Sequence, residues 1–192
     1  MMRQGRGDGS GETAGRMKRV AVIGNAGAGK SKLARELAAI TGLPLHVIDM
    51  MQFREGGAEV PHEEFLAAHA ASIAQDEWIV DGFGSVETAW QRFARADTLI
   101  HVDPPLPASF WGITRRLIAG QFADPQGWPK GSPVWRSSLN SYGVLLPCHR
   151  ELTPRYRRLG AEMGDGKRVV RLRSRAEMRE FLEGVRRERA AA

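Results

Sequence analysis

The sequence predicts an α/β fold in which helices cover both faces of a five-stranded parallel sheet. Short apolar runs rich in β-branched residues alternate with segments whose apolar residues recur at helical spacing. The glycine-rich stretch Gly24–Ser31 lies between the first such run and the first such helix. Strands that alternate with helices pair in parallel, because each helix carries the chain back across the sheet.

The expected strands are short apolar runs bounded by turn-forming or charged residues. The second run is expected to end at Asp49 and the third at Asp81, each with its carboxylate at the strand end. Turn-forming residues at Gly42 and Pro44 end the first helix. The expected strands are 19–23, 45–48, 78–80, 98–102 and 167–172, and the expected helices are 33–40, about 61–75, 86–95, 108–119 and 176–189.

The rest of the chain has less regular patterns. Residues 1–16 are polar and glycine-rich, which predicts a disordered tail ahead of one domain that spans residues 17–192. Prolines and glycines interrupt residues 120–136, which predicts a long loop or lid. One or two helices are expected after it, broken near Pro147 and Pro154.

Composition narrows the class of protein. The chain has 192 residues, a net charge of +6 and a single cysteine, Cys148. One cysteine excludes an internal disulfide and suits a reducing compartment, so we expect a cytoplasmic monomer or homodimer. No apolar run approaches the roughly 18 residues of a membrane span, and we expect no membrane partner. Basic residues are in excess mainly between residues 150 and 189. This excess is explained either by a solvated, charged surface or by a nucleic-acid-binding site.

The stretch from Gly24 to Ser31 matches G-x-x-x-x-G-K-[ST], the phosphate-binding loop of P-loop proteins. Its glycines permit positive φ, and its main-chain N–H groups and the following helix N-terminus attract anions. Lys30 is expected to reach the β- and γ-phosphates of ATP, and the Ser31 hydroxyl to ligate Mg²⁺. The alternative is a glycine turn with a chance lysine. The expected ATP-binding residues are Gly24, Asn25, Ala26, Gly27, Ala28, Gly29, Lys30 and Ser31.

Two strand-end aspartates are expected beside this loop, because ligands bind at the carboxyl ends of parallel strands. Asp81 is placed to hold Mg²⁺, directly or through water. Asp49 is placed as a catalytic base or orienting group that faces the phosphate acceptor. For each of them, a cap at the end of a strand is the structural alternative. Asp103, which precedes two prolines, is expected to be structural.

Four arginines are candidates for contacts to phosphate. Arg92 and Arg95 lie one helical turn apart and are expected to bind the acceptor. Arg115 and Arg116 precede the lid and are expected to close over the transferring phosphate. Surface roles remain open for each of them. His46 and His101 alternate with apolar strand residues and are expected to be core or strand-end histidines.

Four blocks of the chain resemble the adenylate-kinase-like P-loop proteins often called DNA topology modulation proteins. The likeness spans residues 18–117 and implies a nucleotide-kinase-like fold with ATP held by residues 24–31. Asp81–Phe83 is also similar to the D-G-F-P-R block of adenylate kinases, with Gly84 and Ser85 in place of its proline and arginine. The blocks are V-I-G-N-A-G-A-G-K-S, G-L-P-L-H-V-I-D, W-I-V-D-G and R-F-A-R-A-D-T-L-I-H-V-D-P-P.

These features favour a kinase that transfers the γ-phosphate of ATP to a small-molecule acceptor. Asp49 favours transfer over hydrolysis, because a simple ATPase needs no carboxylate on the acceptor side. The alternative is a regulatory or nucleic-acid-associated P-loop ATPase. No helix-turn-helix, zinc knuckle or aromatic RNA-binding block in the sequence supports that alternative.

Overall fold

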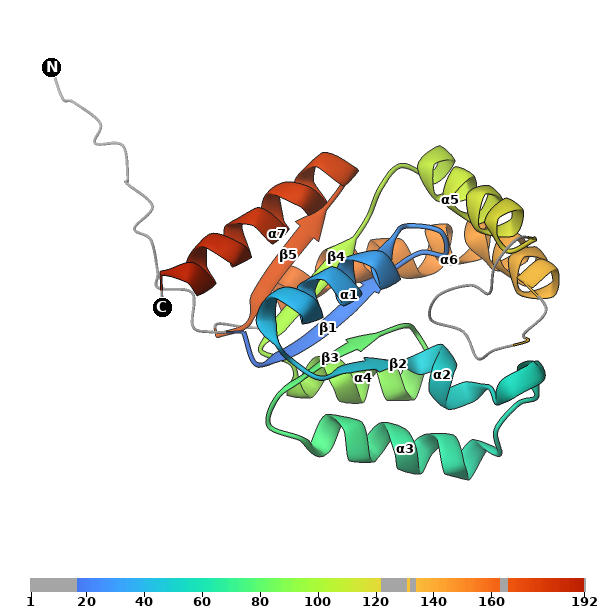
Figure 1. Cartoon of the computed structure of the whole chain (residues 1–192), viewed down its shortest axis with the longest axis horizontal. Coiled ribbons are helices and arrows are strands. Elements are labelled where there is room, and N and C mark those ends of the chain that lie inside the picture. The colour runs from blue at the N-terminus through green and yellow to red at the C-terminus, as the bar shows by residue number, and fades with distance from the viewer. Residues whose placement is uncertain (1–16, 122–130, 132–133, 163–165, 192) are drawn as a thin grey trace, which may run out of the picture.

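The computed structural model of the chain describes residues 17–121, 131, 134–162 and 166–191. One parallel sheet has the strand order β2-β3-β1-β4-β5 and carries helices on both faces (Figure 1), which confirms the predicted fold class. The expected tail, residues 1–16, lies outside the described residues. The strands are β1 (Arg19–Gly24), β2 (Leu45–Val47), β3 (Trp78–Asp81), β4 (Thr98–Val102) and β5 (Arg168–Leu172). The helices are α1 (Lys30–Thr41), α2 (Ile48–Gln52), α3 (His62–Ala74), α4 (Val86–Arg95), α5 (Leu106–Ala119), α6 (Val134–Glu162) and α7 (Arg175–Ala190), with the 3₁₀ turn η1 (Glu55–Gly57).

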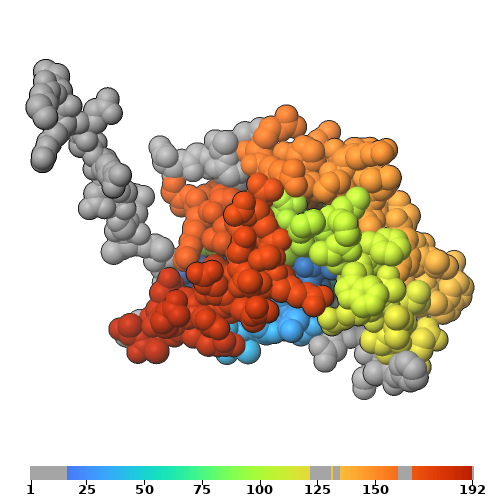
Figure 2. Space-filling model, turned by 90° about the horizontal axis from the view of Figure 1, so that it is seen from above, coloured from blue at the N-terminus to red at the C-terminus, as the bar shows by residue number. Residues whose placement is uncertain are grey.

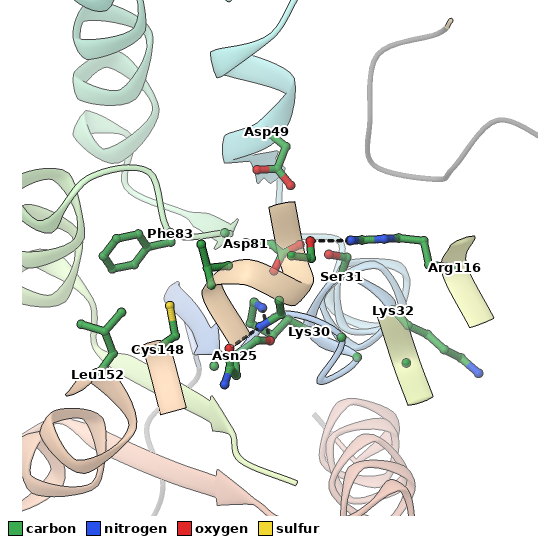
Figure 3. A pocket seen from close by; sticks show the side chains of 18 of the residues that line it. Asn25, Lys30, Ser31, Lys32, Asp49, Asp81, Phe83, Arg116, Cys148 and Leu152 are labelled. Carbon is green, nitrogen blue, oxygen red and sulfur yellow. Dashed lines mark hydrogen bonds between the residues drawn. The ribbon is translucent and has the colours of Figure 1, made fainter. Parts of the chain in front are cut away.

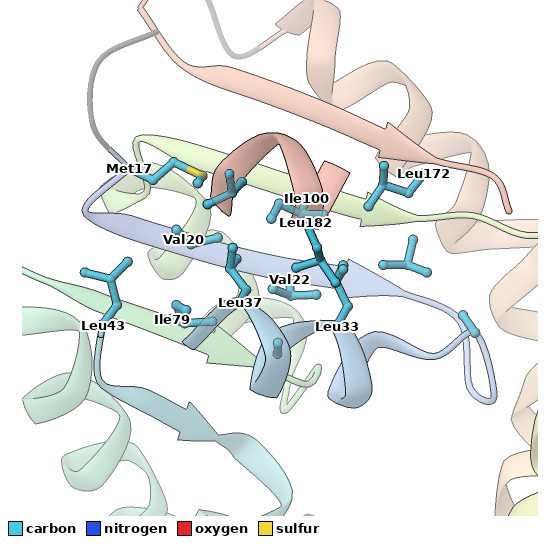
Figure 4. Packing of buried hydrophobic residues seen from close by; sticks show 14 residues of the cluster. Met17, Val20, Val22, Leu33, Leu37, Leu43, Ile79, Ile100, Leu172 and Leu182 are labelled. Atoms are coloured by element: carbon cyan, nitrogen blue, oxygen red, sulfur yellow. The ribbon is translucent and has the colours of Figure 1, made fainter. Parts of the chain in front are cut away.

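Side chains of the strands alternate between two cores. Val20 and Val22 of β1 belong to a cluster with residues of α1 and α7 (Figure 4). Ala21 and Ile23 belong to a second cluster on the opposite face, with residues of α3, α4 and α6. Successive side chains of a strand point to opposite faces, so a sheet buried on both sides needs the continuous apolar run seen in β1.

The second strand is shorter than expected. It ends at Val47, and Ile48 begins α2, so the prediction of a strand over 45–48 that ends at Asp49 is wrong. Asp49 instead occupies the first turn of α2, where the partial positive charge of a helix N-terminus favours a carboxylate. Asp49 thus remains near the carboxyl end of β2, but a helix rather than a strand end sets its direction.

Helix α6 runs without interruption from Val134 to Glu162, so the breaks expected near Pro147 and Pro154 are wrong. Both prolines are exposed. An exposed proline costs the helix a hydrogen bond on the side where water can replace it. Residues 134–136 of the expected lid form the first turn of this helix, and residues 122–130 and 132–133 lie outside the described part of the chain. None of the described helices is long and apolar enough to span a membrane.

Asp103, directly after β4, ties α6 to the sheet. Its carboxylate accepts hydrogen bonds from Nε of Arg157 on α6 at 2.9 Å and from Nε of Arg171 on β5 at 2.8 Å. Burial works to raise the pKa of Asp103, but the two arginine hydrogen bonds hold it below its usual value. The expected structural role of Asp103 is confirmed.

Helix α5 packs directly on the phosphate loop. A Cβ added at Gly112 of α5 would collide with the carbonyl oxygen of Gly27, and one added at Gly27 would collide with the carbonyl oxygen of Ser109. Two backbones can approach this closely only where side chains are absent. The glycine pair therefore sets the position of α5 relative to the loop.

We expect Gly112→Ala to destabilise the protein by about 1–3 kcal/mol, because the added methyl group forces α5 away from the loop. Gly143→Ala is the matched control: Gly143 lies in α6, and a Cβ there would meet nothing within 4 Å. This control should be neutral or stabilising by about 0.5–1 kcal/mol. Urea denaturation measures both, and equal stability of the two variants would contradict the proposed contact.

Candidate active site

A cavity of about 780 Å³ lies at the carboxyl ends of the central strands (Figure 3). The phosphate loop, the first turn of α2, the end of β3, and helices α5 and α6 supply its walls. It is lined by Gly24, Asn25, Ala26, Gly27, Gly29, Lys30, Ser31, Lys32, Arg35, Asp49, Asp81, Gly82, Phe83, Gly112, Arg116, Ala119, Gly120, Ser141, Val144, Cys148, Leu152, Thr153 and Tyr156.

The phosphate loop has the backbone that its sequence predicts. Gly27 and Gly29 adopt φ of 71° and 98°, left-handed values that side-chain-bearing residues rarely adopt. The turn at Gly29 delivers Lys30 and Ser31 into the first turn of α1, whose N–H groups have no partner within the helix. Lys30 Nζ donates to the carbonyl oxygen of Asn25 at 2.7 Å and so lies across the loop.

The side chain of Asn25 fastens this loop to α6. Its Nδ2 donates to the carbonyl oxygen of Leu145 at 2.9 Å, and its Oδ1 accepts from the N–H of Ala26 at 2.8 Å. The described contacts of this side chain are therefore structural, although the residue lies within the loop expected to bind ATP.

Asp81 ends β3 inside the cavity. Its Cα pairs with Val22 of β1 and with Val47 of β2, which brings it beside the phosphate loop. Asp81 is only 2% exposed, and its Oδ1 has no hydrogen-bond partner among the described residues. A buried carboxylate oxygen without a donor is costly, so this atom suits a cation. Ser31 lines the same cavity.

Asp49 and Lys30 perturb each other across the cavity. Burial, followed by repulsion from Asp81, raises the pKa of Asp49 to about 6, against the opposing effect of Lys30 and Arg116. Burial lowers the pKa of Lys30, while the carboxylates of Asp81 and Asp49 raise it. A carboxyl group whose pKa lies closer to neutrality is a stronger base than an ordinary aspartate.

The two arginines near the end of α5 have different surroundings. Arg116 is half-buried and lines the cavity, where its Nη2 donates to Oγ of Ser141 on α6 at 2.6 Å (Figure 3). Burial lowers the pKa of Arg116, an effect that the nearby Asp49 opposes. Arg115 is exposed and does not line this cavity; it lines a neighbouring one.

The structure does not bring Arg92 and Arg95 to the cavity. Arg92 is 1% exposed, and its Nη2 donates to the carbonyl oxygens of Gly82 and Phe83 at 3.1 and 2.6 Å. Burial lowers the pKa of Arg92 to about 10. Arg95 is exposed in the last turn of α4. Both residues were expected to face an acceptor, but α4 packs the face that carries Arg92 against the sheet and leaves Arg95 in solvent.

A second cavity of about 560 Å³ lies on the other side of the phosphate loop, between α1, α5 and α7. From above, blue atoms of the N-terminal part of the chain are visible at the bottom of a hollow between α7 and α5 (Figure 2). This second cavity shares several residues with the first, among them Gly27, Gly29 and Arg116, and is also lined by Trp111, which is 54% exposed. Its other basic lining residues are Lys32, Arg115, Arg173, Arg175 and Arg179.

Several lining residues carry no motif that could have identified them. Gly112, Ser141, Cys148 and Tyr156 reach the first cavity only because α5 and α6 fold over the phosphate loop. His101, in contrast, is a core residue as expected: it is 2% exposed, and burial lowers its pKa to about 4.

Arg92 and Arg95 form a matched pair for testing their roles. We expect Arg92→Met to destabilise the protein by about 2–4 kcal/mol, since the carbonyls of Gly82 and Phe83 lose the donor that fixes their turn. Arg95→Met, on the exposed face of the same helix, should change stability by less than about 0.5 kcal/mol. Chemical denaturation measures both. A stable Arg92→Met protein with weakened ligand binding would instead make Arg92 a binding residue.

Solved structures that are similar to the chain include two kinases. Shikimate kinase from Acinetobacter baumannii, in complex with shikimate, is 13% identical over 92% of this chain and 94% of that chain, with a TM-score of 0.48. An unliganded sugar kinase from Janibacter sp. HTCC2649 is 16% identical over 90% of this chain and 91% of that chain, with a TM-score of 0.42. No protein-family model and no curated protein matches the chain.

Proposed function

We propose that the protein is a kinase that transfers the γ-phosphate of ATP to a hydroxyl group of a small molecule. One observation carries the proposal: Lys30 of the phosphate loop lines the same cavity as the two carboxylates Asp49 and Asp81. Phosphoryl transfer requires a cation at the transferring phosphate, a metal ligand and a group that accepts the proton of the attacking hydroxyl. This cavity holds candidates for all three.

The phosphates of ATP are proposed to bind at the loop from Gly24 to Ser31. The unpaired N–H groups at the start of α1 and the partial positive charge of that helix suit an anion. Lys30 Nζ, which bonds to the loop's own Asn25 carbonyl, is free to exchange that partner for a phosphate oxygen. The half-buried Arg116 is proposed to stabilise the charge on the transferring phosphate.

The nucleoside end of ATP is proposed to occupy the second cavity. That cavity shares loop residues Gly27 and Gly29 with the first, so one nucleotide can extend from one cavity to the other. The exposed indole of Trp111 offers a stacking surface for the base. Arg115, which also lines this cavity, is thereby proposed to contact the donor nucleotide.

Magnesium fits the pair Ser31 and Asp81. The unpaired Oδ1 of Asp81 is the observation that favours a cation there. In the described part of the chain, no group of three or more histidine, cysteine, aspartate or glutamate side chains could hold a metal ion. Mg²⁺ suits such a site, since it takes one or two protein ligands and completes its shell with phosphate oxygens and water. Bound there, it would neutralise charge on the β- and γ-phosphates.

Asp49 is proposed to act as the base. With a pKa near 6, it is ionised at neutral pH and can accept the proton as the acceptor hydroxyl attacks. The acceptor oxygen then forms a bond to the γ-phosphorus, the bond from that phosphorus to the β,γ-bridging oxygen breaks, and ADP leaves. A nucleic-acid-associated ATPase remains the competing function, and hydrolysis stimulated by DNA but by no acceptor would favour it.

We expect Lys30→Ala to weaken ATP binding by about tenfold to a hundredfold, the loss typical of one charge-assisted hydrogen bond. Isothermal titration calorimetry measures the affinity. Lys18→Ala, which removes an exposed lysine just before β1, is the control and should bind ATP like the unaltered protein. Undiminished affinity in Lys30→Ala would refute ATP binding at this loop.

We expect Asp49→Asn to lower transfer by about 10²–10⁴-fold with ATP affinity retained, as expected for loss of a general base. In the unaltered protein, kcat/KM should rise with pH through about 6, because Asp49 must lose its proton to act. His46→Gln, which removes the imidazole nearest to Asp49 in sequence, should keep that profile. Unchanged turnover in Asp49→Asn would remove Asp49 from the mechanism.

The Asp49→Asn substitution can also be tested through the pH dependence of stability, which needs no acceptor. Because the pKa of Asp49 is raised from 3.8 to about 6 on folding, the folded state holds this proton more tightly than the unfolded state. Its contribution to stability therefore falls as pH rises between those two values. Relative to the unaltered protein, Asp49→Asn should gain thermal stability at pH 7 compared with pH 4.

A further inference from the structure

The wall of the first cavity that faces away from Arg116 is apolar. Phe83, Cys148 and Leu152 lie together there, on the side of Asp81 opposite to Arg116 (Figure 3). Phe83 and Val144 also line the cavity, although 36% and 48% of their surfaces are exposed. Large apolar side chains left exposed inside a concave site are typical of surfaces that a ligand covers.

Arg92 lies behind the Gly82–Phe83 turn and is too buried to contact a ligand at this wall directly. Both carbonyls of the Gly82–Phe83 turn accept from Nη2 of Arg92, whose side chain is buried beneath them. This pair of hydrogen bonds fixes the turn that presents the Phe83 ring to the cavity. Arg92 therefore acts as a positioning residue for Phe83, and it is not among the residues that line the cavity, although its buried Nη1 has no hydrogen-bond partner among the described residues.

The charges of the cavity come from the elements around the phosphate loop. The cations belong to α1 and α5, and the carboxylates belong to α2 and β3. The described lining residues of α6 and of the Gly82–Phe83 turn carry no side chain that is charged at neutral pH. The cations are Lys30, Lys32, Arg35 and Arg116, the carboxylates are Asp49 and Asp81, and the α6 residues are Ser141, Val144, Cys148, Leu152, Thr153 and Tyr156.

Resting on the kinase function proposed above, we infer that the acceptor is an uncharged alcohol with a flat or apolar body. Its hydroxyl group meets Asp49, and its body packs between Phe83 and the α6 side chains Val144 and Leu152. A phosphate or carboxylate on that body would lose its hydration against apolar side chains, and the described lining residues of this wall offer it no cation, which is strongly unfavourable. The class includes nucleosides and aromatic or alicyclic alcohols, and it excludes nucleoside monophosphates.

The test compares acceptors in pairs that share a skeleton and differ in charge. Each nucleoside is assayed against its 5′-monophosphate, and each aromatic alcohol against its ring-carboxylated derivative, with formation of ADP and of the phosphorylated product as readouts. We expect the neutral member of the productive pair to have at least a tenfold higher kcat/KM, because it leaves no buried charge unpaired. Preference for the anionic member would overturn this inference and leave the kinase function standing.

A charge placed on the wall should change that preference. Val144→Arg adds a guanidinium at a half-exposed position that tolerates a long polar side chain, and we expect it to shift the ratio of kcat/KM at least tenfold toward the anionic member. Leu146→Arg is the control: it adds the same charge to α6 at a residue that is 43% exposed and does not line the cavity. Equal ratios in the two variants would overturn the inference.

Failure of the proposed function gives a different result. ATP hydrolysis that no acceptor of either charge alters, with no phosphorylated product, would overturn the kinase proposal itself and with it the acceptor class. ATP affinity, measured in the same proteins by calorimetry, should be equal in Val144→Arg, in Leu146→Arg and in the unaltered chain. A loss confined to Val144→Arg would show that this wall belongs to the donor site, which also overturns the inference.

Discussion

The register of the three central strands determines where the chemistry of this protein is concentrated. Asp81 stands opposite Val22 of β1 on one side and Val47 of β2 on the other. Main-chain hydrogen bonds of a parallel sheet allow no intermediate registers, and a slip by one residue would turn Asp81 to the other face. With this register, the residues after β1, β2 and β3 meet at one edge, so the phosphate loop, Asp49 and Asp81 enclose one cavity.

Charges at that edge are only partly compensated. Lys30 is partnered by a carbonyl, Asp81 keeps an oxygen without a donor, and Asp49 has a pKa raised to about 6. Such groups lower the stability of a closed core, because a buried charge without a partner is unfavourable. Asp103 illustrates the opposite case, since Arg157 and Arg171 pair with its carboxylate and the group serves the fold. The charges of the cavity therefore differ from this ion-paired carboxylate of the scaffold.

Helix α5 borders both cavities, with α6 completing the first and α7 the second. Gly112 lets α5 rest on the loop backbone at Gly27, and the Asn25 side chain holds α6 at Leu145. Helix α6 also supplies the neutral wall opposite the charged elements. The basic cavity between α1, α5 and α7 is proposed for the donor nucleoside, and the largely apolar wall of the first cavity is proposed for the acceptor.

The sequence by itself predicted the phosphate loop, the order of strands and helices, and the strand-end position of Asp81, because glycine spacing and apolar periodicity are local properties. It missed the continuity of α6 through Pro147 and Pro154 and the start of α2 at Ile48. Only the tertiary structure decided which of the four candidate arginines faces the first cavity: Arg116 lines it, whereas Arg92, Arg95 and Arg115 do not. Packing decides which way a side chain faces and how deeply it is buried, and burial shifts its pKa. Packing depends on residues far away in the chain, so these properties could not be predicted from local sequence.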